Sequence, residues 1–326
     1  MTMKVAGKRI YALILILVLL CCGAVVAEDN SESPEEINME DLLELFELIQ
    51  YQHDHYYELA QPELPLERKY TPLGAYNVGY AEYDVQDEAL QKIEIWYPEG
   101  LSEDNYPVVI MVNGTGVPAS QYQSVFRHLA SWGFIVVGSE DPSSGFGIGT
   151  EKTLQFLLAL NEDMADPFCG KIDIDLIGLC GHSQGGAGVF SALTLTEHGD
   201  IYKTAVALSP TYEEMAHLLG WPYRLENIKI PTLMLAGTKG EFETELVIPI
   251  DKMIAMYEKI PAPKVMARHT GSEHGDMLYD VDAYMTAWFM WQLQGDTEAA
   301  KVFHGEAPEL LTNPQYQDQR IEIIQP

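Results

Sequence analysis

The sequence predicts an α/β protein with a mostly parallel, doubly wound sheet that is covered by helices on both faces. Short apolar runs alternate along the chain with segments of helical length and pattern. Runs such as Val108–Val112 and Thr232–Ala236 are typical of strands buried on both faces, because a parallel sheet carries helices on each side. The chain has 326 residues, of which 47% are hydrophobic, and this is enough to form one large core.

The expected elements follow one another in the order of a doubly wound sheet, without an internal repeat. The pattern opens with a hairpin, formed by Tyr76–Tyr83 and Lys92–Trp96. The later strands are expected at Val108–Val112, Phe134–Gly138, Ile172–Leu179, Thr204–Leu208, Thr232–Ala236 and Lys264–Arg268. The helices are expected at Gln121–Trp132, Glu151–Leu160, Gly185–Thr196, Pro249–Lys259 and Ala283–Gln294.

Residues 1–27 have the pattern of a secretory signal peptide. A basic start precedes the apolar run Ile10–Cys22, and small residues end at Ala27. The basic residues are Lys4, Lys8 and Arg9. We therefore expect export to the extracellular space or periplasm, with cleavage taking the formal charge from −30 to −33. The alternatives are a membrane anchor formed by an uncleaved signal, or by a lipid on Cys21 or Cys22; no stable membrane insertion is expected after cleavage.

Residues 28–67 form an acidic N-terminal segment, which we expect to contain a helix and a linker before the main domain, residues 68–326. Met39–Tyr57 has the broad apolar side of an amphipathic helix that packs on the main domain, forms a lid or contacts a second copy. Pro62 and Pro65 mark the linker. The oligomeric state is left open.

Composition excludes several classes of protein. The chain carries 49 acidic against 19 basic residues, whereas nucleic-acid binding requires clustered Lys and Arg. Cys numbers only 4, which excludes a disulfide scaffold. Cys169 and Cys180 bracket one expected strand, and a strand rises about 3.3 Å per residue. That separation exceeds disulfide reach, so we predict two unpaired thiols.

The segment Gly181-His182-Ser183-Gln184-Gly185 matches the pattern G-x-S-x-G and lies between an expected strand and an expected helix. A sharp turn at this place holds a serine in a strained conformation with its hydroxyl exposed. The helix that follows directs its N-terminal N–H groups at developing negative charge. The pattern therefore predicts Ser183 as a nucleophile; the alternative is a glycine-rich turn that serves only packing.

A tetrahedral intermediate at such a serine requires two N–H donors for its oxyanion. The residue after the nucleophile, Gln184, supplies one. The loop Asn113-Gly114-Thr115-Gly116 follows an earlier strand, and Thr115, with Gly116 next, is the second expected donor. Asn113 also begins a glycosylation sequon, which we interpret as coincidence because a glycan would obstruct the loop.

A base must take the proton of the serine, and His is the usual group. His274 follows the last expected strand of the main series and precedes the final helix, so it lies at the same sheet edge as Ser183. His269 is the alternative, but it is nearer the strand end.

The acid that orients the base should lie between them in the chain, after a strand. Thr232–Ala236 is followed by the loop Gly237-Thr238-Lys239-Gly240-Glu241-Phe242-Glu243. Glu241 is the first choice, and Glu243 and Glu245 are alternatives from the same acidic loop.

The order Ser183, Glu241, His274 on such a sheet resembles the α/β-hydrolase superfamily. More closely, the chain resembles cutinase-like polyester (PET) hydrolases and dienelactone-hydrolase or platelet-activating-factor-acetylhydrolase-like esterases. The segments that carry this resemblance are YPVVIMVNGTG, HLASWGFIVVGSEDPSSG, GHSQGGAG, IPTLMLAGTKGE, GSEHGDM and AYMTAWFMWQLQGD. They cover roughly residues 76 to 315. The resemblance implies that 68–326 is an α/β-hydrolase catalytic domain.

The chain departs from the polyester hydrolases at several places. Those enzymes usually have Trp as the second residue of the serine motif or in the loop after the next strand, where this chain has His182 and Ser209-Pro210-Thr211-Tyr212. Their paired C-terminal cysteines are missing, and their acid is usually Asp. These departures leave general ester hydrolysis intact.

The expected function is that of a secreted serine carboxylesterase for neutral, modest-sized esters, which works through an acyl-enzyme. The partner is a small or polymeric ester, and no metal or cofactor is required. Gly145-Phe146-Gly147-Ile148-Gly149 lacks the spacing of a nucleotide-binding loop. A polyester hydrolase is the alternative within the class, followed by thioester hydrolase, acylpeptidase-like and acyltransferase activities. A catalytically silent binding module on the same fold is the alternative from another class.

Overall fold

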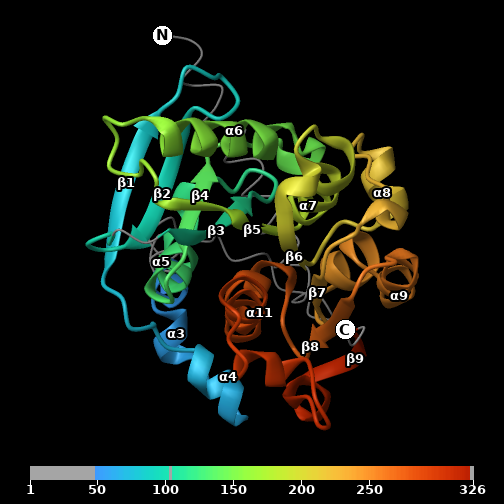
Figure 1. Ribbon diagram of the computed structural model, residues 1–326. Helices are drawn as coiled ribbons and strands as arrows, with labels where there is room; N and C mark the ends of the chain where they lie inside the picture. Colours follow the sequence, from blue (N-terminus) through green and yellow to red (C-terminus); the bar gives the residue numbers. More distant parts are fainter. Residues whose placement is uncertain (1–47, 103–104, 324–326) are drawn as a thin grey trace, which may run out of the picture. The chain divides into compact units, whose positions relative to one another are not determined.

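The computed structural model describes residues 48–102 and 105–323. The chain divides into two compact units, Met1–His53 and Asp54–Pro326, and the second holds the elements described below (Figure 1). The described end of the first unit, residues 48–53, is helical. The expected signal peptide, Cys21, Cys22 and the acidic stretch up to residue 47 lie outside the described residues.

Nine strands form a single sheet in the described part of the chain, in the order β1-β2-β4-β3-β5-β6-β7-β8-β9. The six strands β3 to β8 are parallel, whereas β2 is antiparallel to β1 and β4, and β9 is antiparallel to β8. The strands are β1 Val78–Asp84, β2 Lys92–Pro98, β3 Tyr106–Val112, β4 Ile135–Ser139, β5 Ile172–His182, β6 Tyr202–Leu208, β7 Thr232–Gly237, β8 Lys264–His269 and β9 Tyr316–Glu322.

Helices connect the strands and follow them. The α-helices are α3 Tyr56–Leu59, α4 Pro65–Tyr70, α5 Gln123–Ser131, α6 Ile148–Glu162, α7 Gln184–Leu195, α8 Glu213–Leu218, α9 Ile250–Lys259, α10 Met277–Asp280 and α11 Asp282–Gln294. The 3₁₀ helices are η2 Ala119–Gln121, η3 Ser144–Phe146, η4 Gly199–Ile201, η5 Leu225–Asn227, η7 His274–Asp276, η8 Ala299–Val302 and η9 Glu309–Thr312, and η6, Phe242–Val247, is a π-helix.

Both faces of the sheet are buried. Successive residues of β3 alternate between two core clusters. Val108 and Ile110 belong to the first cluster, and Val109 and Met111 belong to the second. The first cluster contains side chains of α6, α7 and α9, and the second contains side chains of α5 and α11. Figure 1 shows α6 and α7 on one side of the sheet and α5 and α11 on the other. The predicted fold class, a mostly parallel sheet between two helical layers, is confirmed.

The predicted hairpin, the six predicted later strands and the five predicted helices are all present, with ends that differ by a few residues. The sequence pattern missed β9, whose residues are mostly polar and of which only Tyr316 is buried. An edge strand of this kind has no apolar run to detect. The pattern also missed the short helix α8.

The second compact unit begins at Asp54, within the segment 28–67. Both α3 and α4 belong to it, and Pro65, which we expected in a linker, is the first residue of α4. Proline is favoured there, because the first helical N–H has no partner within the helix. Tyr70 at the end of α4 is fully buried.

Both cysteines of the described chain are free thiols, which confirms the prediction of two unpaired cysteines. Cys180 is buried in β5, and its sulfur lies 3.3 Å from the sulfur of Met285. Burial raises the pKa of the Cys180 thiol above its ordinary value and so disfavours the reactive thiolate. Among the helices of the described residues, none is long and apolar enough to cross a membrane.

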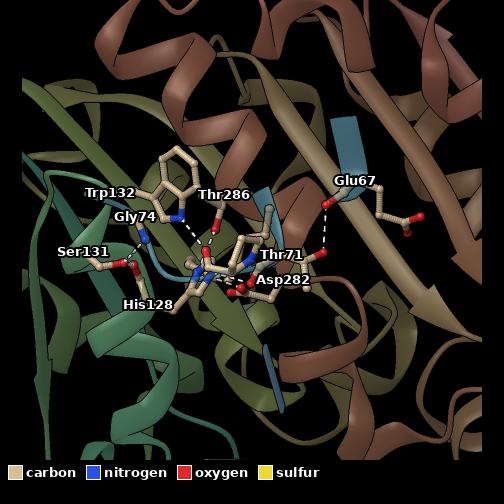
Figure 2. Close-up of polar contacts among 11 residues, drawn as sticks. Glu67, Thr71, Gly74, His128, Ser131, Trp132, Asp282 and Thr286 are labelled. Atoms are coloured by element: carbon tan, nitrogen blue, oxygen red, sulfur yellow. Dashed lines mark hydrogen bonds and ion pairs between the residues drawn. The ribbon is translucent and has the colours of Figure 1, made fainter. Parts of the chain in front are cut away.

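A buried polar cluster fastens the loop after α4 to α5 and α11 (Figure 2). Nδ1 of His128 lies 2.8 Å from the carboxylate of Asp282, and both side chains are buried. Nε2 of His128 donates to the main-chain carbonyls of Thr71 and Pro72, at 2.9 and 3.0 Å. Because Nε2 faces two acceptors and Nδ1 faces a carboxylate, the geometry favours the doubly protonated ring.

We expect His128→Leu to lower the free energy of unfolding by about 3–5 kcal/mol, because the Asp282 charge would stay buried without its partner. Chemical denaturation measures the change. Lys229→Ala is the control: Lys229 pairs with Asp200 on the surface, where the two side chains are 75% and 89% exposed, and its loss should change little. A His128→Leu protein as stable as the wild type would contradict the ion pair.

The same pair gives a pH dependence. Burial alone lowers the pKa of His128, but the charge and hydrogen bond of Asp282, with the two carbonyls, raise it above the ordinary value. Because this pKa is higher in the folded state, the ion pair contributes its full stabilisation at a pH below the pKa of the unfolded state, about 6.5. The stabilisation is lost as the pH rises through the pKa of the folded state. The difference between wild type and His128→Leu should therefore narrow toward alkaline pH.

Candidate active site

Ser183 lies at the junction between β5 and α7 in a conformation that serine rarely adopts. Its φ is 60° and its ψ is −120°. A Cβ on Gly181 would lie 2.2 Å from the carbonyl oxygen of Gly185, and one on Gly185 would lie 1.9 Å from that of Val112. The backbone around the serine thus approaches too closely for any side chain at these two positions. This is the strained strand-to-helix turn that the sequence predicts.

The backbone of Ser183 is fixed from the neighbouring strand. Its N–H donates to the carbonyl of Leu208, at the end of β6, over 2.9 Å. Its carbonyl accepts the N–H of Gly186 at 3.0 Å, which is the first turn of α7. The strained residue is therefore held on both sides by regular structure.

His274 begins η7, just beyond β8, at the carboxyl edge of the sheet. Its Nδ1 donates to Oε2 of Glu243 over 2.6 Å. The Glu243 side chain is fully buried, and its other oxygen, Oε1, accepts from the hydroxyl of Ser209 and the N–H of Gly237, each at 2.6 Å. The carboxylate thus accepts three hydrogen bonds, and one of its oxygens faces the imidazole.

The choice of Glu241 as the acid requires correction. The structure leaves Glu241 exposed at the start of η6 and brings Glu243 to His274 instead. The loop forms a π-helix, in which Ile248 N–H donates to the carbonyl of Glu243, five residues back, at 2.9 Å. Glu243 points into the protein, while Glu245, the other alternative, is exposed like Glu241.

The environment keeps Glu243 ionised. Burial by itself raises the pKa of a carboxyl group, but here the hydrogen bond and charge of His274 lower it. The donors on Ser209 and Gly237 act in the same direction, so the pKa of Glu243 lies below its ordinary value. A charged, buried carboxylate stabilises a protonated imidazole beside it.

His182, the second residue of the serine motif, directly precedes Ser183 and contacts His274. Its Nε2 donates to the main-chain carbonyl of His274 over 2.8 Å, and the two rings are 4.5 Å apart. Burial, followed by the nearby charge of His274, lowers the pKa of His182 to about 3. His182 therefore stays neutral and acts as a hydrogen-bond donor. The sequence did not single it out for this contact.

Among the described residues, no hydrogen bond joins the Ser183 hydroxyl to the ring of His274. The two residues lie at the same edge of the sheet, where His182, the neighbour of Ser183, contacts His274. Hydrogen bonds of this kind are often long or misaligned without substrate. The ring of Phe242 also lies against His274, edge-on to the imidazole, with 4.9 Å between the ring centroids.

The expected oxyanion donors lie on two segments beside Ser183. Gln184 is the first residue of α7, and Thr115 is in the turn after β3. Neither main-chain N–H donates a hydrogen bond within the part of the chain that the structure describes. A Cβ on Gly114 would lie 3.8 Å from the Cβ of Ser183, so the turn runs close to the serine.

Asn113 anchors this turn. Its side-chain nitrogen donates to the carbonyls of Ser139 and Asp141, at 2.6 and 3.0 Å, and its side-chain oxygen accepts the hydroxyl of Tyr122. The side chain is only 2% exposed, so its nitrogen is not accessible for glycosylation.

The described residues contain one group with metal-ligand spacing, formed by Glu151, Glu197 and His198. Nδ1 of His198 is bonded to the carboxylate of Glu151. This group contains a partly exposed ion pair between α6 and the turn after α7, and among the described residues no hydrogen bond or ion pair links it to Ser183.

A serine strained at a strand-to-helix turn and a His–carboxylate pair at the same sheet edge, in this chain order, define an α/β-hydrolase. The family comparison agrees: a model described as PET hydrolase-like matches residues 82–320. The chain belongs to this family, which confirms the resemblance to polyester-hydrolase-like esterases and makes the protein a hydrolase of esters. No curated protein is significantly similar to the chain in sequence.

We expect Glu243→Gln to lower the free energy of unfolding at neutral pH by about 1–3 kcal/mol, because the amide loses the charge-assisted bond to His274. The pKa of Glu243 is lowered in the folded state. The ionised carboxylate therefore stabilises the protein at a pH above the pKa of the unfolded state, and this stabilisation is lost as the pH falls through the pKa of the folded state. The difference from wild type should shrink on acidification. Glu241→Gln is the matched control and should follow the wild type throughout.

Denaturant unfolding across acidic and neutral pH measures both variants. Equal behaviour of the two would show that Glu243 carries no special interaction.

Proposed function

We propose that this protein is a secreted serine carboxylesterase in which Ser183 is the nucleophile, His274 the base and Glu243 the orienting acid. The observation that carries the proposal is the strained Ser183 at the same sheet edge as a His274 whose Nδ1 is held by a buried carboxylate at 2.6 Å. A bond from Nδ1 to a carboxylate leaves Nε2 free to accept the proton of the serine.

In the proposed reaction His274 takes the proton of Ser183 while the hydroxyl oxygen of Ser183 attacks the ester carbonyl. The N–H groups of Gln184 and Thr115 donate to the oxyanion, and the start of α7 adds a favourable dipole. His274 then protonates the leaving alcohol, and the acyl group stays on Ser183. Water, deprotonated by His274, then attacks the acyl carbonyl; the bond to Ser183 breaks, the acid leaves, and His274 returns the proton to the Ser183 oxygen.

Glu243 has two effects in this scheme. It fixes the tautomer of His274 through Nδ1, and its negative charge stabilises the imidazolium that forms during attack. Because Glu243 is fully buried, this charge is weakly screened by solvent. The neutral His182 adds no competing positive charge to the site.

The charge of the protein favours neutral esters. The formal net charge is −30, so the protein repels anionic substrates within the screening length that the ionic strength sets. Around the site the exposed side chains include apolar ones: Phe242 is 43% exposed and Leu246 is 53% exposed, both on η6 beside the base. These surfaces suit an uncharged acyl or alcohol group.

Polyester hydrolysis is the second candidate, and the family match favours it. A polymer chain must lie along an open surface, and the exposed Phe242 and Leu246 would offer apolar contacts to it. Release of soluble products from an amorphous polyester film, compared with turnover of small soluble esters, distinguishes the two substrates.

Export is part of the proposal. The basic start, apolar run and small residues that end at Ala27 support it. Sequencing the N-terminus of protein recovered outside the cell tests it, with Glu28 as the expected first residue.

We expect Ser183→Ala to lower kcat for a p-nitrophenyl ester by at least about a thousandfold, because acyl transfer loses its nucleophile. Glu243→Gln should lower kcat by about a hundredfold or more, since the base loses its orienting charge. Glu241→Gln, two residues away in the same loop, should retain activity. Initial rates over a series of acyl chain lengths measure these values.

A neutral ester and one with a carboxylate on its acyl group separate the effect of charge from that of size. The neutral ester should be hydrolysed faster, and added salt should reduce the difference. Absence of turnover on every ester of the series, with folded protein, would sink the proposal.

A further inference from the structure

Ser209, the first residue after β6, has a backbone conformation that is unusual for serine. Its φ is 41°. Within the described residues, four non-glycine residues have positive φ: Gln91, Ser183, Ser209 and Asp318. A strained residue persists only where its surroundings enforce it, and such residues concentrate at functional sites. Ser183 is the proposed nucleophile, and Ser209 is the second strained residue beside it.

The side chain of Ser209 points at the acid. Its hydroxyl donates to Oε1 of Glu243 over 2.6 Å, and both residues are completely buried. The hydroxyl and the N–H of Gly237 share this oxygen, while Oε2 faces His274. Two donors on one oxygen restrict rotation of the carboxylate and keep the other oxygen directed at the imidazole.

The residues next to Ser209 hold the nucleophile. The carbonyl of Leu208 accepts the N–H of Ser183 at 2.9 Å, and Thr211 N–H donates to the carbonyl of Ser183 at 3.3 Å. Pro210 packs against the start of α7, where a Cβ on Gly186 would lie 2.7 Å from the Cα of Pro210. One turn of four residues therefore contacts both the strained serine and, through Ser209, the buried acid.

We infer that Ser209 is a positioning residue of this site, whose hydroxyl fixes the Glu243 carboxylate relative to His274 while its turn holds Ser183. The inference rests on the proposed function for its catalytic consequence. The strain at Ser209 is explained by this geometry: the positive φ turns the side chain toward Glu243 while Leu208 and Thr211, on either side of Ser209 and Pro210, stay hydrogen-bonded to Ser183.

The hydroxyl also affects the charge of the acid. The donor on Ser209 is one of the interactions that lower the pKa of Glu243 against the effect of burial. Without it the pKa of Glu243 would rise, and the carboxylate would take up a proton at a higher pH during acidification. Orientation and ionisation of Glu243 thus depend on the same hydrogen bond.

The test uses Ser209→Gly and Ser209→Ala in the full chain. Glycine accepts a φ of 41° without strain, so Ser209→Gly removes the hydroxyl but favours the backbone of the turn. We expect kcat for a neutral p-nitrophenyl ester to fall by about tenfold to a hundredfold, the range for a bond to a charged group, with little change in KM. The acidic limb of the profile of kcat/KM against pH should move to higher pH in both variants.

Gln91→Gly is the matched control. Gln91 has a φ of 57°, lies before β2 and has no contact with the site, so its replacement relieves strain without touching Glu243. Its kcat and pH profile should equal those of the wild type. Unfolding curves at the assay temperature confirm that each variant is folded when its activity is measured.

The outcomes separate this inference from the proposed function. If the wild type hydrolyses esters and Ser209→Gly, folded, has the same kcat and the same acidic limb, the inference on Ser209 is overturned. If the wild type hydrolyses no ester, the proposed function fails instead. The pH dependence of unfolding still reports on the bond in that case: the acid-induced loss of stability assigned to Glu243 should begin at higher pH in Ser209→Gly, and an unchanged curve would overturn the inference.

Discussion

The site depends on one backbone constraint, the strained conformation of Ser183 at the junction of β5 and α7. A positive φ at a serine is unfavourable, and here the chain maintains it by close packing on every side. The carbonyl of Val112 leaves no room for a side chain on Gly185, and Leu208 accepts the N–H of Ser183. Three neighbouring parallel strands, β3, β5 and β6, thus meet at this residue, and their carboxyl ends place the remaining groups around it.

The second feature of the site is a buried glutamate where an aspartate would be expected from related enzymes. In the π-helix η6, Glu243 enters the protein while Glu241 and Glu245, two residues before and after it, stay in solvent. Single π turns are frequent at functional sites. The longer side chain still reaches Nδ1 of His274, because Ser209 and Gly237 hold its other oxygen.

Much of the fold could be predicted from the sequence because its signal is strong. Short apolar runs such as Val108–Val112 are typical of strands in a sheet that is covered on both faces, and this run is part of β3. Chain order then placed Ser183 and His274 at the same edge, which the sheet topology shows. β9 was not predictable in this way, since its polar residues lie at an edge and resemble a loop.

The acid was beyond prediction for a different reason. Three glutamates occur within five residues, and the choice among them depends on the hydrogen-bond pattern of one turn, which side-chain pattern does not reveal. Ser209 and His182 carried no recognisable signal either. Their contacts with Glu243 and with the carbonyl of His274 arise from backbone positions on separate strands. Residues that orient a site through such contacts become visible only when the strands are assembled.

We propose that the strain at Ser183 prepares a nucleophile. Incubation of the folded protein with a fluorophosphonate, followed by mass spectrometry of the intact chain and of its peptides, tests this role of Ser183. We expect one adduct per chain, located on Ser183 and absent from Ser183→Ala. A folded protein that takes up no label, or that carries it on another residue, would show that Ser183 is not the nucleophile.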